Sequence, residues 1–280
     1  MAITLPRTGI HAFLREVARA RRSVLLLDYD GTLAPFCSDR SRATPYPGVT
    51  QLLSDIMETG RTRVAVLTGR RAHELLPLLA LTPPPEIWGT HGRERLSSDG
   101  SYERQPVDAT TVEALNQADL WVDSIELHHL VEHKPAALAV HWRGLSEANA
   151  HEIRNKVLLG WLSIADRACL TIDDFDGGIE LRSADCSKGD AVRAILSEVS
   201  VDAPVAYLGD DEADEPAFDA LTDRGLRVLV RPHWRETHAD VWLRPPMQVL
   251  QFLGDWLNAT RPTNDAQTPP PVGTFLGRSA

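Results

Sequence analysis

The chain has 280 residues but few cysteines, no long apolar run and no excess of positive charge. Its three cysteines, Cys37, Cys169 and Cys186, lie far apart, and the absence of a Cys-x-x-Cys pair argues against a zinc site or a redox couple. No apolar run reaches about 18 residues, the length that a membrane-spanning helix needs. The N-terminus also lacks the compact apolar stretch of a signal peptide. Together with reduced thiols, these absences predict a cytoplasmic protein.

The formal net charge of -10 leaves no basic surface for nucleic acid or for an acidic membrane, so we expect neither as a partner. It does not exclude a small anionic substrate, because a metal ion and a few cations can make one site locally positive. The hydrophobic fraction of 43% and the charged fraction of 24% are typical of a globular protein. A chain of this length forms one large domain or two modest ones.

Short apolar runs alternate with helical patterns over most of the chain. Buried strands are predicted for the runs at residues 23–28, 63–69, 86–89, 204–210 and 226–230. Helical periodicity is found between and around them, at residues 10–17, 47–60, 71–81, 188–199 and 215–225. Strands that alternate with helices of this length indicate a parallel sheet with helices on both faces, which is an α/β fold.

The section from residue 108 to residue 182 breaks this rhythm. Period-two alternation places Leu138 and Val140 on one strand face and Ala139 on the other. A helical stretch that Ser146 can cap follows, and two more strands flank an Asp-Gly-Gly turn. Antiparallel strands with a helix, inserted in an α/β chain, predict a second, smaller domain.

These patterns divide the chain into three parts. We expect a core domain formed by residues 1–107 and 183–260, and a smaller α+β domain formed by residues 108–182. The last residues, 261–280, are rich in proline, threonine and glycine, and they are predicted to form a disordered tail.

Two aspartates, Asp28 and Asp30, follow the first predicted strand and precede Gly31. In an open parallel sheet, ligands bind beyond the carboxyl ends of the strands, so both carboxylates stand where chemistry is expected. Two carboxylates beside a flexible turn can provide a nucleophile and an acid–base group. A carboxylate that attacks a phosphate dianion also needs a metal ion to offset the repulsion. The alternative is a strand that ends in a polar turn.

A second acidic group follows the predicted strand 204–210, in the segment GDDEADE at residues 209–215. Several carboxylates at one strand end repel one another unless a cation neutralises them. Oxygen ligands without histidine or cysteine are those that Mg²⁺ prefers. The alternative is a solvated acidic first turn of a helix, which the helix dipole favours.

Two smaller signals accompany these aspartates. Thr68, Gly69 and Arg70 end the second strand, where a hydroxyl and backbone N–H groups can hold phosphate oxygens. Lys188 begins a predicted helix, although the helix dipole disfavours a cation there. The position becomes reasonable if Lys188 neutralises a phosphate or an aspartate. Taken singly, each signal has an ordinary alternative, a threonine in a turn and a solvated lysine.

In their order along the chain, these four motifs resemble those of the haloacid dehalogenase superfamily of phosphotransferases. The resemblance implies a Rossmann-like parallel-sheet core with a smaller inserted cap domain. It implies that Asp28 is the nucleophile and Asp30 the general acid and then the general base, with Thr68 and Lys188 binding the phosphoryl group. It also implies Mg²⁺ as the cofactor. The implied metal ligands are Asp28, Asp30 through its backbone carbonyl, Asp210 and Asp211.

A narrower resemblance covers residues 28–215. The segments DYDGTLAP, LTGR, GTHGRE, EHKPAALAVHWR, GIELR and GDDEADE are similar to those of the trehalose-6-phosphate phosphatase family. The resemblance implies that the inserted domain and the GTHGRE loop grip the sugars. The implied substrate-binding residues are Gly69, Arg70, His91, Glu94, Glu132, Lys134, Arg143 and Glu180. Carboxylates suit sugar hydroxyls because they accept several hydrogen bonds, although a solvated strand face is the alternative.

The sequence thus predicts a Mg²⁺-dependent phosphatase that acts on a small sugar phosphate. Hydrolysis of trehalose 6-phosphate through an aspartyl-phosphate is the leading hypothesis. One alternative is a related phosphatase for another glycosyl phosphate, of the sucrose, glucosylglycerol or glycosyl-phosphoglycerate type. The other is a non-catalytic sugar-phosphate sensor, or a partner of a trehalose-phosphate synthase. The combination of a nucleophile and an acid argues against the second alternative.

Overall fold

Eight strands form the larger of two sheets in the computed structural model, which describes residues 8–37 and 39–261. Their order across the sheet is β12-β11-β10-β1-β2-β3-β4-β5. Their bounds are β1 Ser23–Leu27, β2 Thr62–Leu67, β3 Glu86–Gly89, β4 Glu94–Leu96, β5 Tyr102–Arg104, β10 Val205–Gly209, β11 Gly225–Val230 and β12 Val241–Leu243. All pairings from β12 to β3 are parallel, and β4 and β5 extend the sheet by antiparallel pairings.

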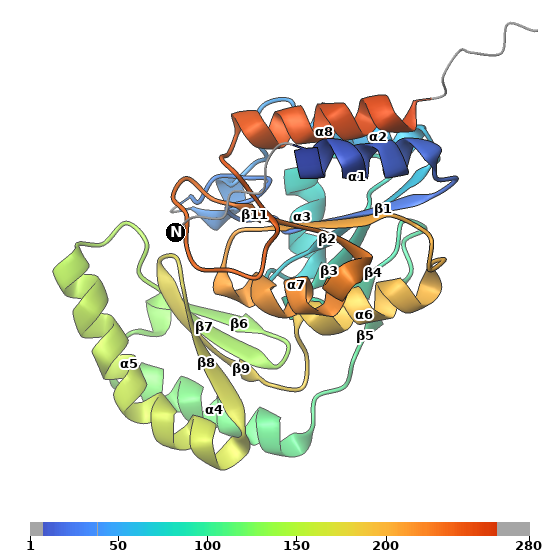
Figure 1. The fold of residues 1–280 in the computed structure, drawn as a ribbon. Coiled ribbons are helices and arrows are strands. Elements are labelled where there is room, and N and C mark those ends of the chain that lie inside the picture. The colour runs from blue at the N-terminus through green and yellow to red at the C-terminus, as the bar shows by residue number, and fades with distance from the viewer. Residues whose placement is uncertain (1–7, 38, 262–280) are drawn as a thin grey trace, which may run out of the picture.

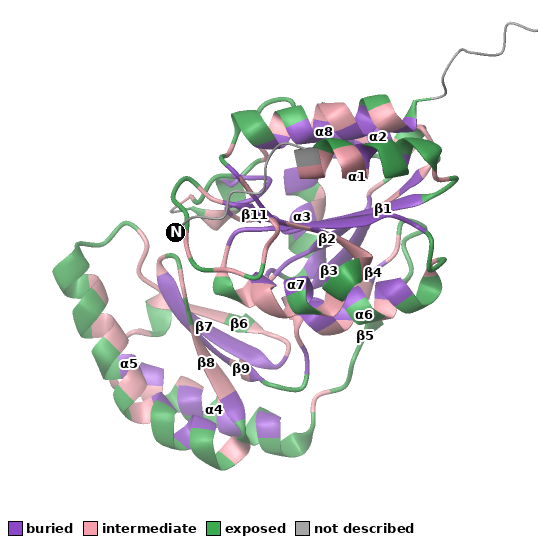
Figure 2. Cartoon of the chain, in the orientation of Figure 1, coloured by how far each residue is buried: buried purple, intermediate pink, exposed green. Residues whose placement is uncertain are grey.

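Helices cover both faces of this sheet (Figure 1). One face packs against α1 Thr8–Arg19, α2 Val49–Glu58, α3 Ala72–Leu79 and α8 Met247–Thr260. The other face packs against α6 Lys188–Glu198 and α7 Glu215–Leu221. Every residue of β1 and β10 is buried, and Figure 2 shows β1 in purple. Burial on both faces explains why these strands read as nearly unbroken apolar runs and show no alternation.

Three motifs that are distant in the sequence meet at one edge of this sheet. Because β1, β2 and β10 are parallel neighbours, their carboxyl ends lie side by side. Asp28 directly follows β1, Thr68 directly follows β2, and Asp210 directly follows β10. The edge therefore carries one polar residue from each motif.

The second sheet has four antiparallel strands in the order β6-β7-β9-β8. Their bounds are β6 Val131–Lys134, β7 Ala137–His141, β8 Leu170–Phe175 and β9 Gly178–Ser183. Helices α4 Ala109–Ser124 and α5 Glu147–Ala168 pack on one face of it. We call this unit, residues 109–183, the cap. In Figure 1 it lies beside the larger sheet, in green and yellow.

The two faces of the cap sheet differ in polarity, as the period of two along a strand requires. Leu138 and Val140 lie in the apolar cluster with the helices, which confirms the alternation predicted for β7. Residues on the opposite face are neighbours across all four strands, in the order Glu132, Ala139, Glu180 and Asp173. A row with three carboxylates thus crosses the face that is turned away from the helices.

Two short linkers, residues 105–108 and 184–187, join the cap to the larger sheet. The buried Arg93 contacts both of them. Its guanidinium donates to the carbonyl of Pro106 at 2.9 Å and pairs with the carboxylate of Asp185. One buried side chain therefore ties the exit of the chain from the larger sheet to its return.

The parallel α/β fold is confirmed, and a few local features differ from the expectation. The sequence patterns miss β4, β5 and β12, because three residues are too few to show alternation. Pro77 lies within α3, two residues before its end. The last cap strand ends at Ser183, one residue beyond the expected end of the insert. The predicted tail lies outside the described residues except for Arg261.

The described helices include none that combines the length and the apolar composition needed to cross a membrane.

Gly160 lies inside α5, where helix propensity alone predicts that alanine stabilises the protein by about 1 kcal/mol. Packing predicts the opposite, because a Cβ atom at Gly160 would lie 2.3 Å from the ring of Trp121 on α4. We expect Gly160→Ala to lower the free energy of unfolding by about 1–3 kcal/mol in chemical denaturation. Gly254→Ala in α8 is the matched control, since a Cβ atom there meets no described atom within 4 Å. If both substitutions stabilise the protein, the close packing of α4 on α5 is incorrect.

Candidate active site

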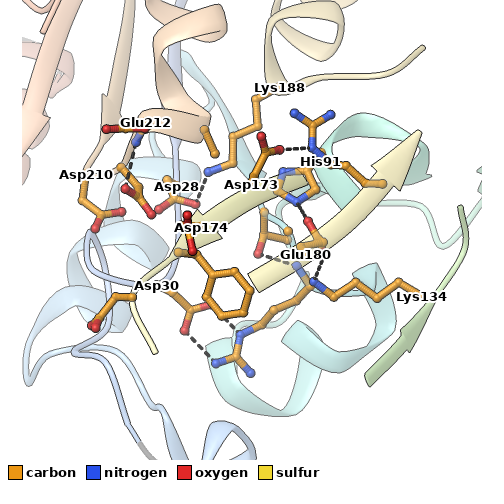
Figure 3. Close-up of a pocket in the computed structure, with 18 of the residues that line it drawn as sticks. Asp28, Asp30, His91, Lys134, Asp173, Asp174, Glu180, Lys188, Asp210 and Glu212 are labelled. Atoms are coloured by element: carbon orange, nitrogen blue, oxygen red, sulfur yellow. Dashed lines mark hydrogen bonds and ion pairs between the residues drawn. The ribbon is translucent and has the colours of Figure 1, made fainter. Parts of the chain in front are cut away.

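A cavity of about 480 Å³ lies between the carboxyl edge of the larger sheet and the polar face of the cap. Asp28, Asp30 and Asp210 line it from the larger sheet, and Lys134 and Glu180 line it from the cap (Figure 3). Its volume is within the range of about 300–1,000 Å³ that is usual for small-molecule sites. All four sequence motifs contribute to it.

Lys188 is the first residue of α6, and its ammonium group holds two aspartates together. Nζ donates to Oδ1 of Asp28 and to Oδ1 of Asp214, both at 2.7 Å, and the side chain is 5% exposed. A capping box between Ser187 and Asp190 fixes the start of the helix. The two carboxylates therefore offset the unfavourable position of a cation at a helix N-terminus.

The buried Asp214 uses both carboxylate oxygens within the protein. Oδ1 accepts hydrogen bonds from Lys188 and from the hydroxyl of Tyr207. Oδ2 accepts from the backbone N–H groups of Asp210 and Asp211, at 3.0 and 3.1 Å. Asp214 thus fixes the loop after β10 against Lys188. Asp214 was not among the predicted site residues, although its place in the acidic segment was a usable signal.

Negative charge is in excess at this point. Burial raises the pKa of Asp28 to about 7, with Lys188 lowering it in part and Asp214 adding to the rise. Burial, Asp28 and Asp214 raise the pKa of Asp210 well above its usual range. Although burial opposes it, the pKa of Lys188 is also raised, because Asp214 and Asp28 favour its charged form. One ammonium group therefore faces three buried carboxylates.

This cluster fits a divalent cation with oxygen ligands. One oxygen atom from each of Asp28, Asp210 and Asp214 lies within 4.8 Å of the other two. Asp214 is engaged by four donors, whereas the described residues provide no hydrogen-bond donor to the Asp210 carboxylate. A buried carboxylate without a donor, next to a second carboxylate, matches the preference of Mg²⁺ for oxygen. Asp28 and Asp210 are thus the best-placed ligands of the four that were predicted.

The backbone at Gly31 makes room for the Asp210 carboxylate. A Cβ atom at Gly31 would lie 2.2 Å from Oδ2 of Asp210, and the residue has a φ of +84°. Both the close approach and the left-handed backbone favour glycine. The glycine that follows Asp30 therefore has a defined structural purpose in bringing the two acidic motifs together.

The other two predicted metal ligands lie in different surroundings. Asp211 lines the cavity, and its carboxylate accepts the Glu212 N–H at 2.8 Å. The Asp30 carboxylate accepts two hydrogen bonds from the Arg70 guanidinium, both at 2.6 Å. Burial alone would raise the pKa of Asp30, but the hydrogen bonds and the charge of Arg70 outweigh it and lower the pKa. Arg70, predicted to bind substrate, thus favours the ionised form of Asp30.

Thr68 and Gly69 line the cavity at the end of β2. The Thr68 hydroxyl accepts the Arg70 N–H at 3.1 Å. A Cβ atom at Gly69 would lie 2.9 Å from the His91 ring, so glycine lets this ring lie close to the strand end. Nε2 of His91 contacts Oε2 of Glu180 at 2.8 Å, which connects the larger sheet to the cap.

Glu180 is central to the polar face of the cap. Its carboxylate accepts a hydrogen bond from Lys134 at 2.5 Å and also contacts His91. Burial alone would raise its pKa, but Lys134 and His91 outweigh it and lower the pKa. Arg143 reaches from the cap to the larger sheet, where it donates to the carbonyl of Cys37 at 3.2 Å. These predicted substrate residues all line the cavity together.

Two predicted substrate residues lie apart from the cavity wall. Glu132 is bonded to Arg40 and His141, which line the cavity, but is not itself among the lining residues. Glu94 is 1% exposed, and it also does not line the cavity. Its carboxylate accepts hydrogen bonds from the backbone N–H of Ala72 and from the hydroxyls of Thr90 and Tyr102. Contrary to our expectation, Glu94 supports the loop that carries His91.

Several cavity residues were not predicted from the sequence, among them Arg40, Asp173 and Arg182. The period-two pattern could have revealed Asp173 and Arg182. Asp173 pairs with Glu180 across the sheet, and Arg182 follows Glu180 by two residues on the same face. Arg182 donates to Asp173 at 2.6 Å. Arg40 lies in a segment without periodicity, which offers no comparable signal.

Comparison with known proteins identifies close matches in sequence. The model of the family described as Trehalose-phosphatase matches residues 26–240. The chain is similar to the trehalose-phosphate phosphatase of Mycobacterium marinum, with 30% identity over 251 residues, which covers 83% of this chain and 61% of that protein. The chain thus spans about three fifths of the length of this relative.

Solved structures share the fold. The C-terminal domain of Candida albicans trehalose-6-phosphate phosphatase superimposes with a TM-score of 0.76 and 19% identity, covering 89% of this chain and 97% of that chain. A haloacid dehalogenase-like hydrolase from Bacteroides thetaiotaomicron gives a TM-score of 0.59 and 15% identity, covering 83% and 98%. At these identities the likeness concerns the fold alone, and it confirms the haloacid dehalogenase fold that the motifs indicated.

Asp210→Asn removes one of three mutually repelling buried carboxylates while keeping the side-chain shape. We expect it to raise the melting temperature of metal-free protein by about 2–4 °C, which corresponds to about 1 kcal/mol for a chain of this size. Differential scanning calorimetry in the presence of a chelator measures it. Asp202→Asn, an exposed aspartate outside the site, is the control and should leave the melting temperature unchanged. A fall in melting temperature for Asp210→Asn would mean that the carboxylate is stabilised by its surroundings.

Proposed function

Because the chain belongs to the trehalose-phosphatase family, we propose that it hydrolyses trehalose 6-phosphate to trehalose and inorganic phosphate. One observation carries this proposal. The lysine-paired Asp28 opens on a cavity whose opposite wall is the polar face of the cap. A candidate nucleophile for phosphorus and a surface rich in acceptors for sugar hydroxyls thus share one space.

Asp28 is the proposed nucleophile. Its carboxylate attacks phosphorus, an aspartyl-phosphate forms, and the bond from phosphorus to the sugar oxygen breaks. Lys188 and Thr68 line the same cavity as Asp28, and their ammonium and hydroxyl groups can bind the negative charge that develops on the non-bridging phosphoryl oxygens. Attack of water on the aspartyl-phosphate then releases phosphate and regenerates the Asp28 carboxylate.

Mg²⁺ is the proposed cofactor, held by Asp28 and Asp210, with Asp30 and Asp211 as the further predicted ligands. When bound, it would offset the repulsion between the attacking carboxylate and the phosphate dianion. The excess negative charge and the donor-free carboxylate of Asp210 support this choice.

Asp30 is the proposed general acid for the leaving sugar oxygen and the general base for the attacking water. Its pair with Arg70 favours the ionised form, which is the form that activates water. Donating a proton to the sugar requires the neutral form, so Asp30 has to take up a proton before that step.

The cap side of the cavity favours a neutral sugar over a substrate with a second charge. The cap cations already have acidic partners, in the pairs Lys134–Glu180, Arg182–Asp173 and Arg143–Asp176, and Arg40 of the opposite side is paired with Glu132 of the cap. A second anionic group would have to displace one of these carboxylates, which would leave a partly buried charge unpaired. This argues against the glycosyl-phosphoglycerate alternative and supports a neutral glycosyl group.

The non-catalytic alternative would be a sensor of sugar phosphates. A sensor needs cations for the phosphate. It does not need a nucleophile that is bound to a lysine, or a second carboxylate that an arginine keeps ionised. A trehalose-phosphate synthase as partner and a cytoplasmic location stay predictions that accompany the proposed function.

Phosphate release from trehalose 6-phosphate, sucrose 6-phosphate and glucose 6-phosphate tests the proposal. We expect trehalose 6-phosphate to have the highest kcat/KM, and Asp28→Asn to lower its turnover by about a thousandfold or more. The asparagine keeps the shape of the side chain but removes the attacking charge. Preference for another ester would redirect the substrate assignment. Retention of more than about a tenth of the activity by Asp28→Asn would exclude the aspartyl-phosphate mechanism.

Removal and return of the metal ion provides a separate test. We expect a chelator to abolish turnover and Mg²⁺ to restore it, whereas Ca²⁺ should restore little, because its larger and looser coordination misplaces the reacting groups. Mg²⁺ should also raise the melting temperature of the wild type and have a smaller effect on Asp210→Asn. Full turnover by metal-free protein would refute the cofactor, while an equal thermal shift in both proteins would refute Asp210 as a ligand.

A further inference from the structure

Arg40 lies outside the cap, in the segment between β1 and α2 that follows Asp28 and Asp30. It begins a short 3-10 turn, Arg40–Arg42, which Asp39 caps by accepting the Ser41 N–H at 3.0 Å. The buried hydroxyl of Tyr29 donates to the carbonyl of Ala43 at 2.6 Å, so the turn is anchored to the residue between the two active-site aspartates. The end of the turn, at Ala43, is therefore anchored to the end of β1, and Arg40 begins the turn three residues earlier.

The side chain of Arg40 crosses to the cap. Its guanidinium forms an ion pair with Glu132 of β6 and lies 3.2 Å from Nε2 of His141. That same ring nitrogen is 2.7 Å from the Glu132 carboxylate. One nitrogen of a neutral ring cannot both donate and accept, and the shorter distance to a carboxylate indicates that it donates to Glu132. Glu132 is thus the partner of both Arg40 and His141.

The backbone carbonyl of Arg40 connects the same residue to Asp30. It accepts a hydrogen bond from Nη1 of Arg70 at 2.8 Å. The other donors of the Arg70 guanidinium, Nε and Nη2, bind the two oxygens of Asp30 at 2.6 Å. The planar guanidinium therefore has one edge on Asp30 and one group on Arg40, and a movement of the Arg40 backbone changes the geometry at Asp30.

We propose that Arg40 is a positioning residue that couples closure of the cap on the larger sheet to the placement of Arg70 against Asp30. When the cap is closed, Glu132 holds the Arg40 side chain, and the Arg40 carbonyl in turn orients Arg70. Two other contacts, His91–Glu180 and Arg143 with the Cys37 carbonyl, also join the cap to the larger sheet. Among the described residues, Arg40 is the one that bonds both to a cap side chain and to the guanidinium that holds Asp30.

The Arg40–Glu132 ion pair is partly shielded from water, so removing one partner costs more than it would for an exposed pair. The side chains of Arg40 and Glu132 are 25% and 18% exposed. Pairs in water contribute little, but removing one partner of a shielded pair leaves the other charge without compensation. Loss of Arg40 should therefore open the contact between cap and larger sheet and leave Glu132 with His141 and the more distant Lys134.

Kinetics of Arg40→Ala test the proposal, which here rests on the proposed function. We expect kcat for trehalose 6-phosphate to fall by about ten- to a hundredfold, at least tenfold more than kcat for p-nitrophenyl phosphate, which is too small to engage the cap. A rise in KM without a fall in kcat would make Arg40 a sugar contact only and would overturn the coupling. Arg42→Ala, an exposed arginine in the same turn, is the matched control and should behave as the wild type.

A double-mutant cycle tests whether Arg40 acts through Glu132. Combined with Glu132→Gln, Arg40→Ala should lower kcat no further than the more severe single change, because both remove the same interaction. Multiplicative losses would show that the two residues act independently and would overturn the pair as the connection. Arg40→Gln keeps most of the side-chain length without its charge, and it replaces Arg40→Ala in the cycle if the alanine variant does not fold.

Small-angle X-ray scattering of the substrate-free protein separates this inference from the proposed function. We expect Arg40→Ala to have a larger radius of gyration than the wild type, and Arg42→Ala to have the same one, because only the first loses a contact that holds the cap closed. Equal radii for all three proteins would overturn the proposed role of Arg40 in closure. If the wild type releases no phosphate from trehalose 6-phosphate, the proposed function fails, and the scattering comparison still decides the role of Arg40.

Discussion

The ammonium group of Lys188 is the interaction on which the organisation of the site depends. It brings together the end of β1, the loop after β10 and the start of α6, because it donates to Asp28 and Asp214 from the first residue of the helix. Asp214 in turn accepts hydrogen bonds from the backbone N–H groups of Asp210 and Asp211, which fixes the loop after β10. Without the lysine, three buried carboxylates would face one another with no cation of the protein between them, which the low polarity of the interior does not tolerate.

Because of this arrangement, the site has more negative than positive charge. Lys188 donates to two carboxylates at once, and the Asp210 carboxylate receives no hydrogen bond from the described residues. The molecule is thus less stable at this point than it could be, in the way expected where binding and chemistry require groups that packing alone would exclude. At the cap end of the cavity, in contrast, acidic and basic side chains are paired with one another. The charge along the cavity therefore changes from strongly negative at the larger sheet to nearly balanced at the cap.

The sequence was sufficient for the α/β fold and for the convergence of Asp28, Thr68 and Asp210, because each marks the end of an apolar run. In a parallel sheet, such ends meet at one edge without further information. The strand period likewise gave the two faces of β7. These predictions need only local sequence patterns and one general rule of sheet geometry, so they could be made without the structure.

Partners across long distances could not be predicted in the same way. Glu94 and Glu180 are both carboxylates on strands, yet the first turns to the Thr90 loop and the second to the cavity, and that choice depends on how the neighbouring elements pack. Arg70 could have faced solvent, a phosphate or Asp30. Arg40 reaches its partner Glu132 in β6 across a gap of about ninety residues in the chain. No periodic pattern encodes such a contact.

The position of Arg93 has a mechanical consequence for the cap. Both linkers are bound to this one buried side chain, at Pro106 and at Asp185. Two polypeptide segments that are fastened at a common point permit rotation about an axis through that point, but they oppose translation. Opening of the cap should therefore be a hinge rotation that moves the β8–β9 turn, which lies at the opposite end of β9 from the second linker. A ligand would enter and leave the cavity on that side.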